Sequence, residues 1–149
     1  ATLHPMLKKT PHEVMLKLQP EIELDSFPGP LGQVVTNLVN NAVLHAFDGM
    51  EHGIITIEAY AAGSELVEIQ IQDNGSGIPQ HHLPKIFDPF FTTRLGQGGS
   101  GLGLHIVYSI VTRVLGGKIN VRSRPSAGTL FTLQLPLIAP LTAKPEITA

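Results

Sequence analysis

The sequence has no cysteine among its 149 residues. This excludes a disulfide framework and any metal site built from thiolates. It is also poor in cations, with 10 Lys and Arg against 12 Asp and Glu and a formal net charge of −2. Because these cations are scattered along the chain, we expect no electrostatic site for a nucleic-acid backbone and no nucleic-acid partner.

Long apolar runs are missing too. No run approaches the roughly 18 to 20 residues that a membrane-spanning helix needs, and residues 1–9 lack the apolar core of a secretory signal. We therefore expect no direct membrane contact from this chain. With 42% hydrophobic residues, the chain can bury one core, so a single domain over residues 1–136 is predicted. Residues 137–149, rich in Pro, Ala and Thr, are predicted to be a flexible tail or linker.

Apolar spacing predicts two helices. One covers residues 31–46, after a break at Pro28, Gly29 and Pro30, and the other begins near Gly101 and ends at Gly116-Gly117. A short helix is also expected within residues 1–11. Alternating patterns predict strands over residues 12–18, 21–24, 54–60, 66–73, 118–123 and 129–135. The last four form two hairpins, which favours an α+β fold: a two-layer α/β sandwich whose mixed sheet is covered by helices on one face.

Glycines are concentrated before the second helix. Residues 96–101 match GxGxxG by letter, but no strand precedes them and no acid follows at about 20 residues, so a Rossmann dinucleotide site is excluded. Gly117-Lys118 is followed by Ile119, which has no hydroxyl for magnesium, and this excludes a Walker loop. A glycine-rich segment before a helix can still present main-chain N–H groups to phosphate. The alternative is a plain flexible loop with a glycine cap.

Asp73 ends a strand, and it has the same parity as Ile71, so its side chain is expected to point into the apolar layer. A buried carboxylate needs a donor, and the exocyclic amine of a purine can supply one. Gly75 and Gly77 would let the main chain approach a flat ring. Thr129 also faces inward, and its hydroxyl can orient the acid. The alternative is a turn with a solvated acid.

Asn37, Asn41 and His45 stand four residues apart along one border of the first helix. An asparagine oxygen is a hard neutral ligand, and Mg²⁺ commonly takes one or two protein oxygens while phosphates and water complete its shell. Asn41 is therefore the expected metal ligand. The alternative is that these are ordinary surface asparagines.

Four segments together resemble the ATP-binding motifs of bacterial two-component sensor histidine kinases. Residues 37–42 resemble the N box, 73–77 the first glycine box, 87–93 the F box and 99–104 the second glycine box. Gly128-Thr129 resembles the last, weaker glycine box, so the resemblance covers about residues 28–136.

This resemblance implies the catalytic ATP-binding domain of such a kinase, with the Bergerat (GHKL-type) fold, ATP and Mg²⁺. It implies that Asp73 binds the adenine amine, that Asn41 holds Mg²⁺ against the phosphates, and that a lid runs from about Phe87 to Gly101. Arg94 is the lid cation best suited to phosphate, the alternative being a solvated loop arginine. The residues implied for ATP binding are Asn37, Asn41, His45, Asp73, Gly75, Gly77, Ile78, Phe87, Thr92, Thr93, Arg94, Gly99, Ser100, Gly101, Leu102, Gly103, Leu104 and Thr129.

Two positions depart from related proteins. Leu44 stands where many of these kinases have a basic residue, and the next residue, His45, either contacts phosphate or packs against Phe47. Asn37 stands where related ATPases such as gyrase have the glutamate that activates water. The resemblance therefore implies that ATP is held for transfer with little hydrolysis, by positioning and charge neutralisation.

No phosphoacceptor histidine is found, so the chain is expected to contain no catalytic residue of its own and not to autophosphorylate alone. The implied partners are the dimerisation and phosphoacceptor domain of the same kinase and a response regulator downstream. The implied location is cytoplasmic, including the cytosolic part of a membrane-bound sensor. Two alternatives stay open: a non-catalytic nucleotide-sensing module, and a serine kinase of the anti-sigma type on the same fold.

Overall fold

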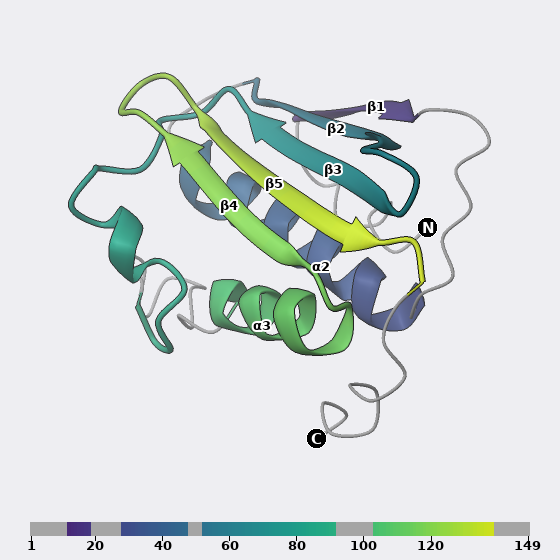
Figure 1. Ribbon diagram of the computed structural model, residues 1–149. Helices are drawn as coiled ribbons and strands as arrows, with labels where there is room; N and C mark the ends of the chain where they lie inside the picture. Colours follow the sequence, from purple (N-terminus) through teal and green to yellow (C-terminus); the bar gives the residue numbers. More distant parts are fainter. Residues whose placement is uncertain (1–11, 19–27, 48–51, 92–102, 139–149) are drawn as a thin grey trace.

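The computed structural model describes residues 12–18, 28–47, 52–91 and 103–138. They form one five-stranded sheet with two helices packed against the same face (Figure 1). This arrangement confirms the predicted α+β two-layer sandwich. The predicted helix within residues 1–11, the strand at 21–24 and most of the tail lie outside the described residues.

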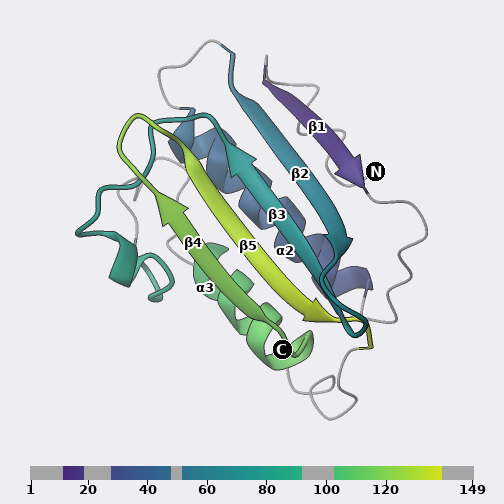
Figure 2. The same ribbon diagram turned by 45° about the horizontal axis from the view of Figure 1, so that its top comes forward.

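The sheet has the strand order β1-β2-β3-β5-β4, seen across its width in Figure 2. The strands are β1 (Glu13–Leu18), β2 (Ile54–Ala61), β3 (Leu66–Asp73), β4 (Lys118–Ser123) and β5 (Thr129–Pro136). β2 with β3 and β4 with β5 are the two expected hairpins, and β3 pairs antiparallel with β5. β1 pairs parallel with β2 and makes the sheet mixed, as predicted.

The first helix, α2 (Pro28–Asn41), begins three residues before the predicted start. The expected break at Pro28, Gly29 and Pro30 is wrong because the first turn of a helix needs no main-chain N–H donors, so proline is tolerated there. The helix continues as a π-helical turn, Ala42–Ala46, and the amide of Phe47 donates to the Ala42 carbonyl at 2.9 Å. The predicted end at Ala46 is confirmed.

The second helix, α3 (Gly103–Ser109), also continues as a π-helical turn, Ile110–Val114. Its predicted start at Gly101 lies outside the described residues. Gly116 has a φ of 71°, the left-handed conformation that commonly terminates a helix. The predicted glycine stop is therefore confirmed.

The core lies between the sheet and the two helices. Residues of one parity on each strand point into it, and the helices contribute their apolar faces. The fully buried side chains include Val34, Leu38, Val39, Phe47, Ile55, Val67, Val107, Val111, Leu115, Leu133 and Leu135. The end of β3 and the start of β5, where Asp73 and Thr129 are paired, thus adjoin this close-packed layer.

In the part of the chain described, no helix is long and apolar enough to span a membrane.

Strand β5 ends at Pro136, and the amide of the next residue, Leu137, donates a hydrogen bond to the Glu65 carbonyl at 2.9 Å.

Candidate functional site

Asp73 is the last residue of β3 and is only 8% exposed. Its Oδ1 accepts hydrogen bonds from the amides of Gly75 (2.9 Å) and Thr129 (3.3 Å). Burial raises the pKa of this carboxyl above its ordinary value, and the two amide donors oppose that rise. The inward orientation predicted from strand parity is confirmed.

The second carboxylate oxygen of Asp73, Oδ2, has no hydrogen-bond partner within the described part of the chain. A buried oxygen without a donor is costly, so it favours a ligand that brings one. The exocyclic amine of adenine is such a donor. Asp73 Oδ2 can therefore accept a hydrogen bond from the amino group of an amino-purine.

The hydroxyl of Thr129 does not orient Asp73, contrary to the sequence prediction. Thr129 Oγ1 lies 2.8 Å from Ser123 Oγ, and the main-chain amide of Thr129 holds the acid instead. Ser123 is 9% exposed and was missed from the sequence. Its signal was available, because Ser123 shares the inward parity of Val121 and Ile119 on β4.

The two glycines after Asp73 are required by the fold itself. A Cβ on Gly75 would collide with the main chain of Ala46, whose carbonyl accepts a hydrogen bond from the Ser76 amide at 2.9 Å. Gly77 has a φ of 76°, and a Cβ there would collide with the carbonyl of Arg124. Other protein atoms thus occupy the space that a side chain at either glycine would need. Packing alone therefore requires glycine at both positions, with or without a bound purine ring.

Asn37 and Asn41 lie on the C-terminal half of α2, and both are partly exposed. Asn37 Nδ2 donates to the Gly103 carbonyl at 3.5 Å, which links α2 to the first turn of α3. The Asn41 side chain makes no hydrogen bond to any other described residue. Its amide oxygen is therefore available to a ligand.

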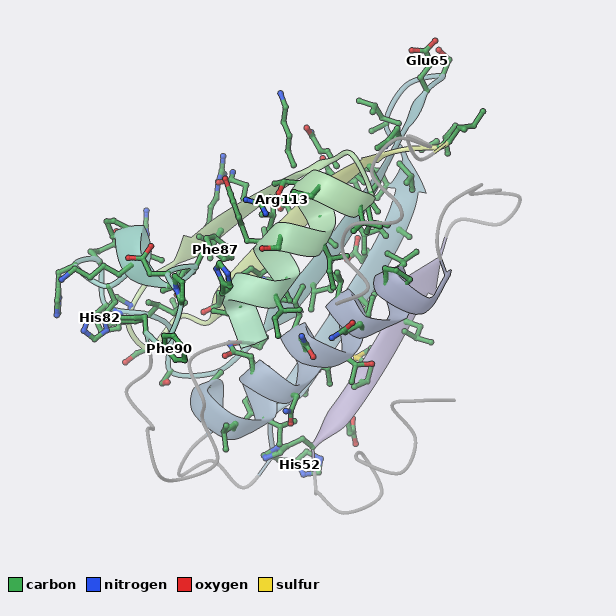
Figure 3. The ribbon with its side chains drawn as sticks, turned by 90° about the horizontal axis from the view of Figure 1, so that it is seen from below. His52, Glu65, His82, Phe87, Phe90 and Arg113 are labelled. Atoms are coloured by element: carbon green, nitrogen blue, oxygen red, sulfur yellow. The ribbon has the colours of Figure 1, made fainter. Side chains whose placement is uncertain are left out.

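Ile78, Phe87 and Leu104 are partly buried and pack against the core. The ring centroid of Phe87, which is labelled in Figure 3, lies 5.4 Å from that of Tyr108 on α3. His105 Nδ1 lies 3.2 Å from the Phe87 carbonyl, so the start of the F box is attached to α3.

The remaining predicted residues cannot be placed. Those outside the described residues are Thr92, Thr93, Arg94, Gly99, Ser100, Gly101 and Leu102, and the side chain of His45 also falls outside the description. The lid and its phosphate contacts therefore stay predictions.

Among the described residues, no group of three or more acidic or histidine side chains is arranged to hold a metal. A protein cage for Mg²⁺ is thus not formed by this part of the chain. Mg²⁺ accepts a smaller protein contribution when phosphates complete its octahedron. The amide oxygen of Asn41, which has no hydrogen-bond partner in the described part of the chain, fits that mode of binding.

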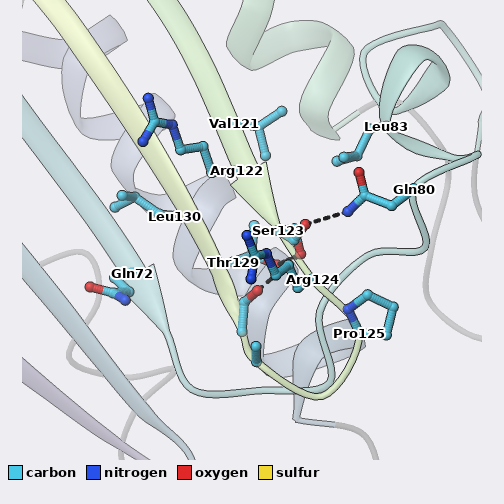
Figure 4. A pocket seen from close by; sticks show the side chains of 12 residues that line it. Gln72, Gln80, Leu83, Val121, Arg122, Ser123, Arg124, Pro125, Thr129 and Leu130 are labelled. Carbon is cyan, nitrogen blue, oxygen red and sulfur yellow. Dashed lines mark hydrogen bonds between the residues drawn. The ribbon is translucent and has the colours of Figure 1, made fainter.

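A hollow of about 720 Å³ lies at the β4–β5 hairpin (Figure 4). Of the predicted site residues only Thr129, the strand partner of Asp73, lines it. Its lining is Gln72, Gln80, Leu83, Val121, Arg122, Ser123, Arg124, Pro125, Ala127, Gly128, Thr129 and Leu130.

The sequence between residues 28 and 139 matches the family described as histidine kinase-, DNA gyrase B-, and HSP90-like ATPase. The chain belongs to this family. The matched range agrees with residues 28–136, over which the sequence motifs resemble those of sensor histidine kinases. All of these motifs lie inside the matched range.

Among curated relatives, sensor histidine kinase ZraS of Salmonella typhi is 39% identical over 133 residues, covering 89% of this chain and 26% of ZraS. Alginate biosynthesis sensor protein KinB of Pseudomonas aeruginosa is 36% identical over 118 residues, covering 79% of this chain and 19% of KinB. The domain thus spans only a minor part of these relatives.

Solved structures of histidine kinases have the same fold as this chain. A mycobacterial sensor histidine kinase, MprB, superposes with a TM-score of 0.78 at 26% identity, covering 93% of this chain and 91% of that one. A nucleotide-free catalytic domain of histidine kinase ThkA gives a TM-score of 0.76 at 29% identity, covering 92% and 88%. The predicted Bergerat fold and the likeness to a sensor-kinase catalytic ATP-binding domain are confirmed.

Proposed function

We propose that this domain binds Mg-ATP and donates the γ-phosphoryl group to a histidine on a dimerisation domain outside the chain, as part of two-component signalling. The observation that carries the proposal is Asp73, which is buried and held by two main-chain amides, with one oxygen that has no partner among the described residues. The likeness of the chain to sensor histidine kinase ZraS supports the phosphoryl-transfer role.

Transfer is favoured over hydrolysis by Asn37. Its neutral amide cannot accept a proton from water, and the amide nitrogen is engaged with the Gly103 carbonyl. Because no general base stands at position 37, we expect the bound nucleotide to be kept for an acceptor that brings its own nucleophile. The domain then contributes positioning and charge neutralisation.

The same proposal assigns residues to the phosphate end of the ATP site. Asn41 offers an amide oxygen to Mg²⁺, which neutralises charge on the phosphates when bound. Arg94 and His45 are the proposed cationic contacts, with residues 87–101 as the lid. Support for these roles comes from the order of the motifs.

The proposed partners are a helical-hairpin phosphoacceptor domain of the same kinase and a response regulator downstream. A cytoplasmic location belongs to the proposal because the phosphoryl donor is ATP. The chain covers a minor part of its relatives, so these partners belong to the longer protein.

The direct test mixes the chain with γ-labelled ATP, Mg²⁺ and a separately produced hairpin domain from a sensor kinase. We expect label on the hairpin that is labile in acid, as a phosphohistidine is, and no label on a hairpin whose histidine is changed to alanine. Acid-stable label would indicate a serine kinase instead. Saturable ATP binding without transfer would favour the nucleotide-sensing alternative.

A further inference from the structure

Ser123, at the end of β4, is a buried hydroxyl with three hydrogen-bond partners. Its Oγ accepts from the Ile78 amide at 2.7 Å, donates to the Gly128 carbonyl at 2.9 Å and is hydrogen-bonded to Thr129 Oγ1 at 2.8 Å. The bond between the two hydroxyls is drawn in Figure 4. Ser123 thus links Ile78, the residue directly after the first glycine box, to the last glycine box.

The direction of the bond between the two hydroxyls follows from a count of protons. A serine hydroxyl has one proton and two lone pairs. The Gly128 carbonyl can only accept, so the Ser123 proton goes there, and the Ile78 amide can only donate. The remaining bond must then be donated by Thr129 Oγ1 to Ser123 Oγ.

The consequence concerns the face that Thr129 presents. Its single proton is used on Ser123, so its oxygen has only lone pairs left for any other partner. Thr129 stands directly opposite Asp73 in the β3–β5 pair, and both side chains are on the buried face. Directly opposite residues place their Cβ atoms about 4.5–5.5 Å apart. The carboxylate and the hydroxyl therefore form an edge of hydrogen-bond acceptors.

We propose that Ser123 is a specificity-determining positioning residue: by holding the Thr129 proton, it makes the site select 6-amino purines against 6-oxo purines. An amino group donates to this edge, whereas an oxo group opposes oxygen to oxygen and leaves buried acceptors unsatisfied. This inference rests on the proposed ATP-binding function and adds to it a residue that touches no nucleotide itself.

The test compares the dissociation constants of ATP and inosine triphosphate, which differ at the purine C6 substituent. In Ser123→Ala, the Thr129 hydroxyl is free to rotate and donate to a 6-oxo group. We expect the ratio of the inosine triphosphate constant to the ATP constant to fall about three- to tenfold, the worth of one hydrogen bond. Ser123→Thr keeps the hydroxyl and should preserve the ratio.

A merely structural role for Ser123 predicts a different result. Both nucleotides would then bind more weakly by the same factor, and the unchanged ratio would overturn the inference. Thr132→Val is the matched control, because it removes a hydroxyl from the same strand, three residues beyond Thr129 and on the opposite face of the sheet. It should leave the ratio unchanged. If the unaltered chain binds no ATP, the proposed function fails with the inference.

A second variant tests the direction of the bond without altering Ser123. Thr129→Val removes the acceptor while keeping the shape of the side chain. We expect weaker ATP binding and little change for inosine triphosphate, because Thr129 makes no favourable bond to a 6-oxo group. An equal loss for both nucleotides would overturn the inference, even where Ser123→Ala does not fold.

Discussion

The main-chain amide of Thr129 donates to Asp73 Oδ1 across the β3–β5 pair, with the two atoms 3.3 Å apart. The acid is therefore oriented by a strand partner, which does not rotate as a side-chain donor would. Gly128, just before Thr129, has a φ of 83°, and a Cβ there would collide with the Asp73 carbonyl. The close approach of the two strand ends is what fixes the carboxylate.

The first prediction concerns the pH dependence of stability. Burial raises the pKa of Asp73 above its ordinary value of 3.8. The folded chain then binds more protons than the unfolded one, so the contribution of this group to stability is full below that ordinary pKa. It is lost as the pH rises through the folded pKa. Asp73→Asn removes this loss.

The free energy of unfolding of Asp73→Asn minus that of the unaltered chain should therefore grow as the pH rises through that window. Urea titrations between pH about 4 and about 7 measure this difference. Parallel profiles for the two proteins would contradict a raised pKa at Asp73.

The second prediction compares two glycines. Gly75→Ala forces a Cβ into the main chain of Ala46 and should lower the free energy of unfolding by about 1–3 kcal/mol. Gly32→Ala is the matched control, because it lies inside α2 with no atom within 4 Å of the added carbon. The control should stabilise the chain by about 0.5–1 kcal/mol. Equal effects in urea unfolding would show that Gly75 is not packed as described.

The third prediction concerns the metal. Asn41→Ala removes the amide oxygen, and we expect the enhancement of ATP affinity by Mg²⁺ to be reduced about tenfold or more, the worth of one metal-linked contact. The fold should persist because alanine is the better helix former. Asn40→Ala, at an exposed neighbouring position on α2, is the control. If both variants respond to Mg²⁺ alike, Asn41 is not the ligand.

Strand parity was the most informative part of the sequence. Alternation along β3 and β5 placed Asp73 and Thr129 on the buried face, and the structure confirms both positions. Parity says which way a side chain points, but it does not identify the atom that bonds. For this reason the amide of Thr129 was missed and its hydroxyl was assigned the wrong partner.

Other features depend on contacts between distant segments. The parallel pairing of β1 with β2 leaves no local signal, because it joins strands separated by a whole helix. The helix start at Pro28 differs from the sequence prediction because proline usually interrupts helices but is tolerated in a first turn. Ser123 is not predicted as a site residue because a single serine on a strand belongs to no recognisable motif. The alternation along β4 does, however, predict that its side chain points into the core.

Calorimetric titration of the chain with ATP and with GTP, each with and without Mg²⁺, tests whether Asp73 recognises the adenine amine. We expect saturable ATP binding that Mg²⁺ strengthens, much weaker GTP binding, and loss of the ATP signal in Asp73→Asn. Equal affinity for the two nucleotides, or unchanged ATP affinity in Asp73→Asn, would contradict the assignment of Asp73 to the adenine amine.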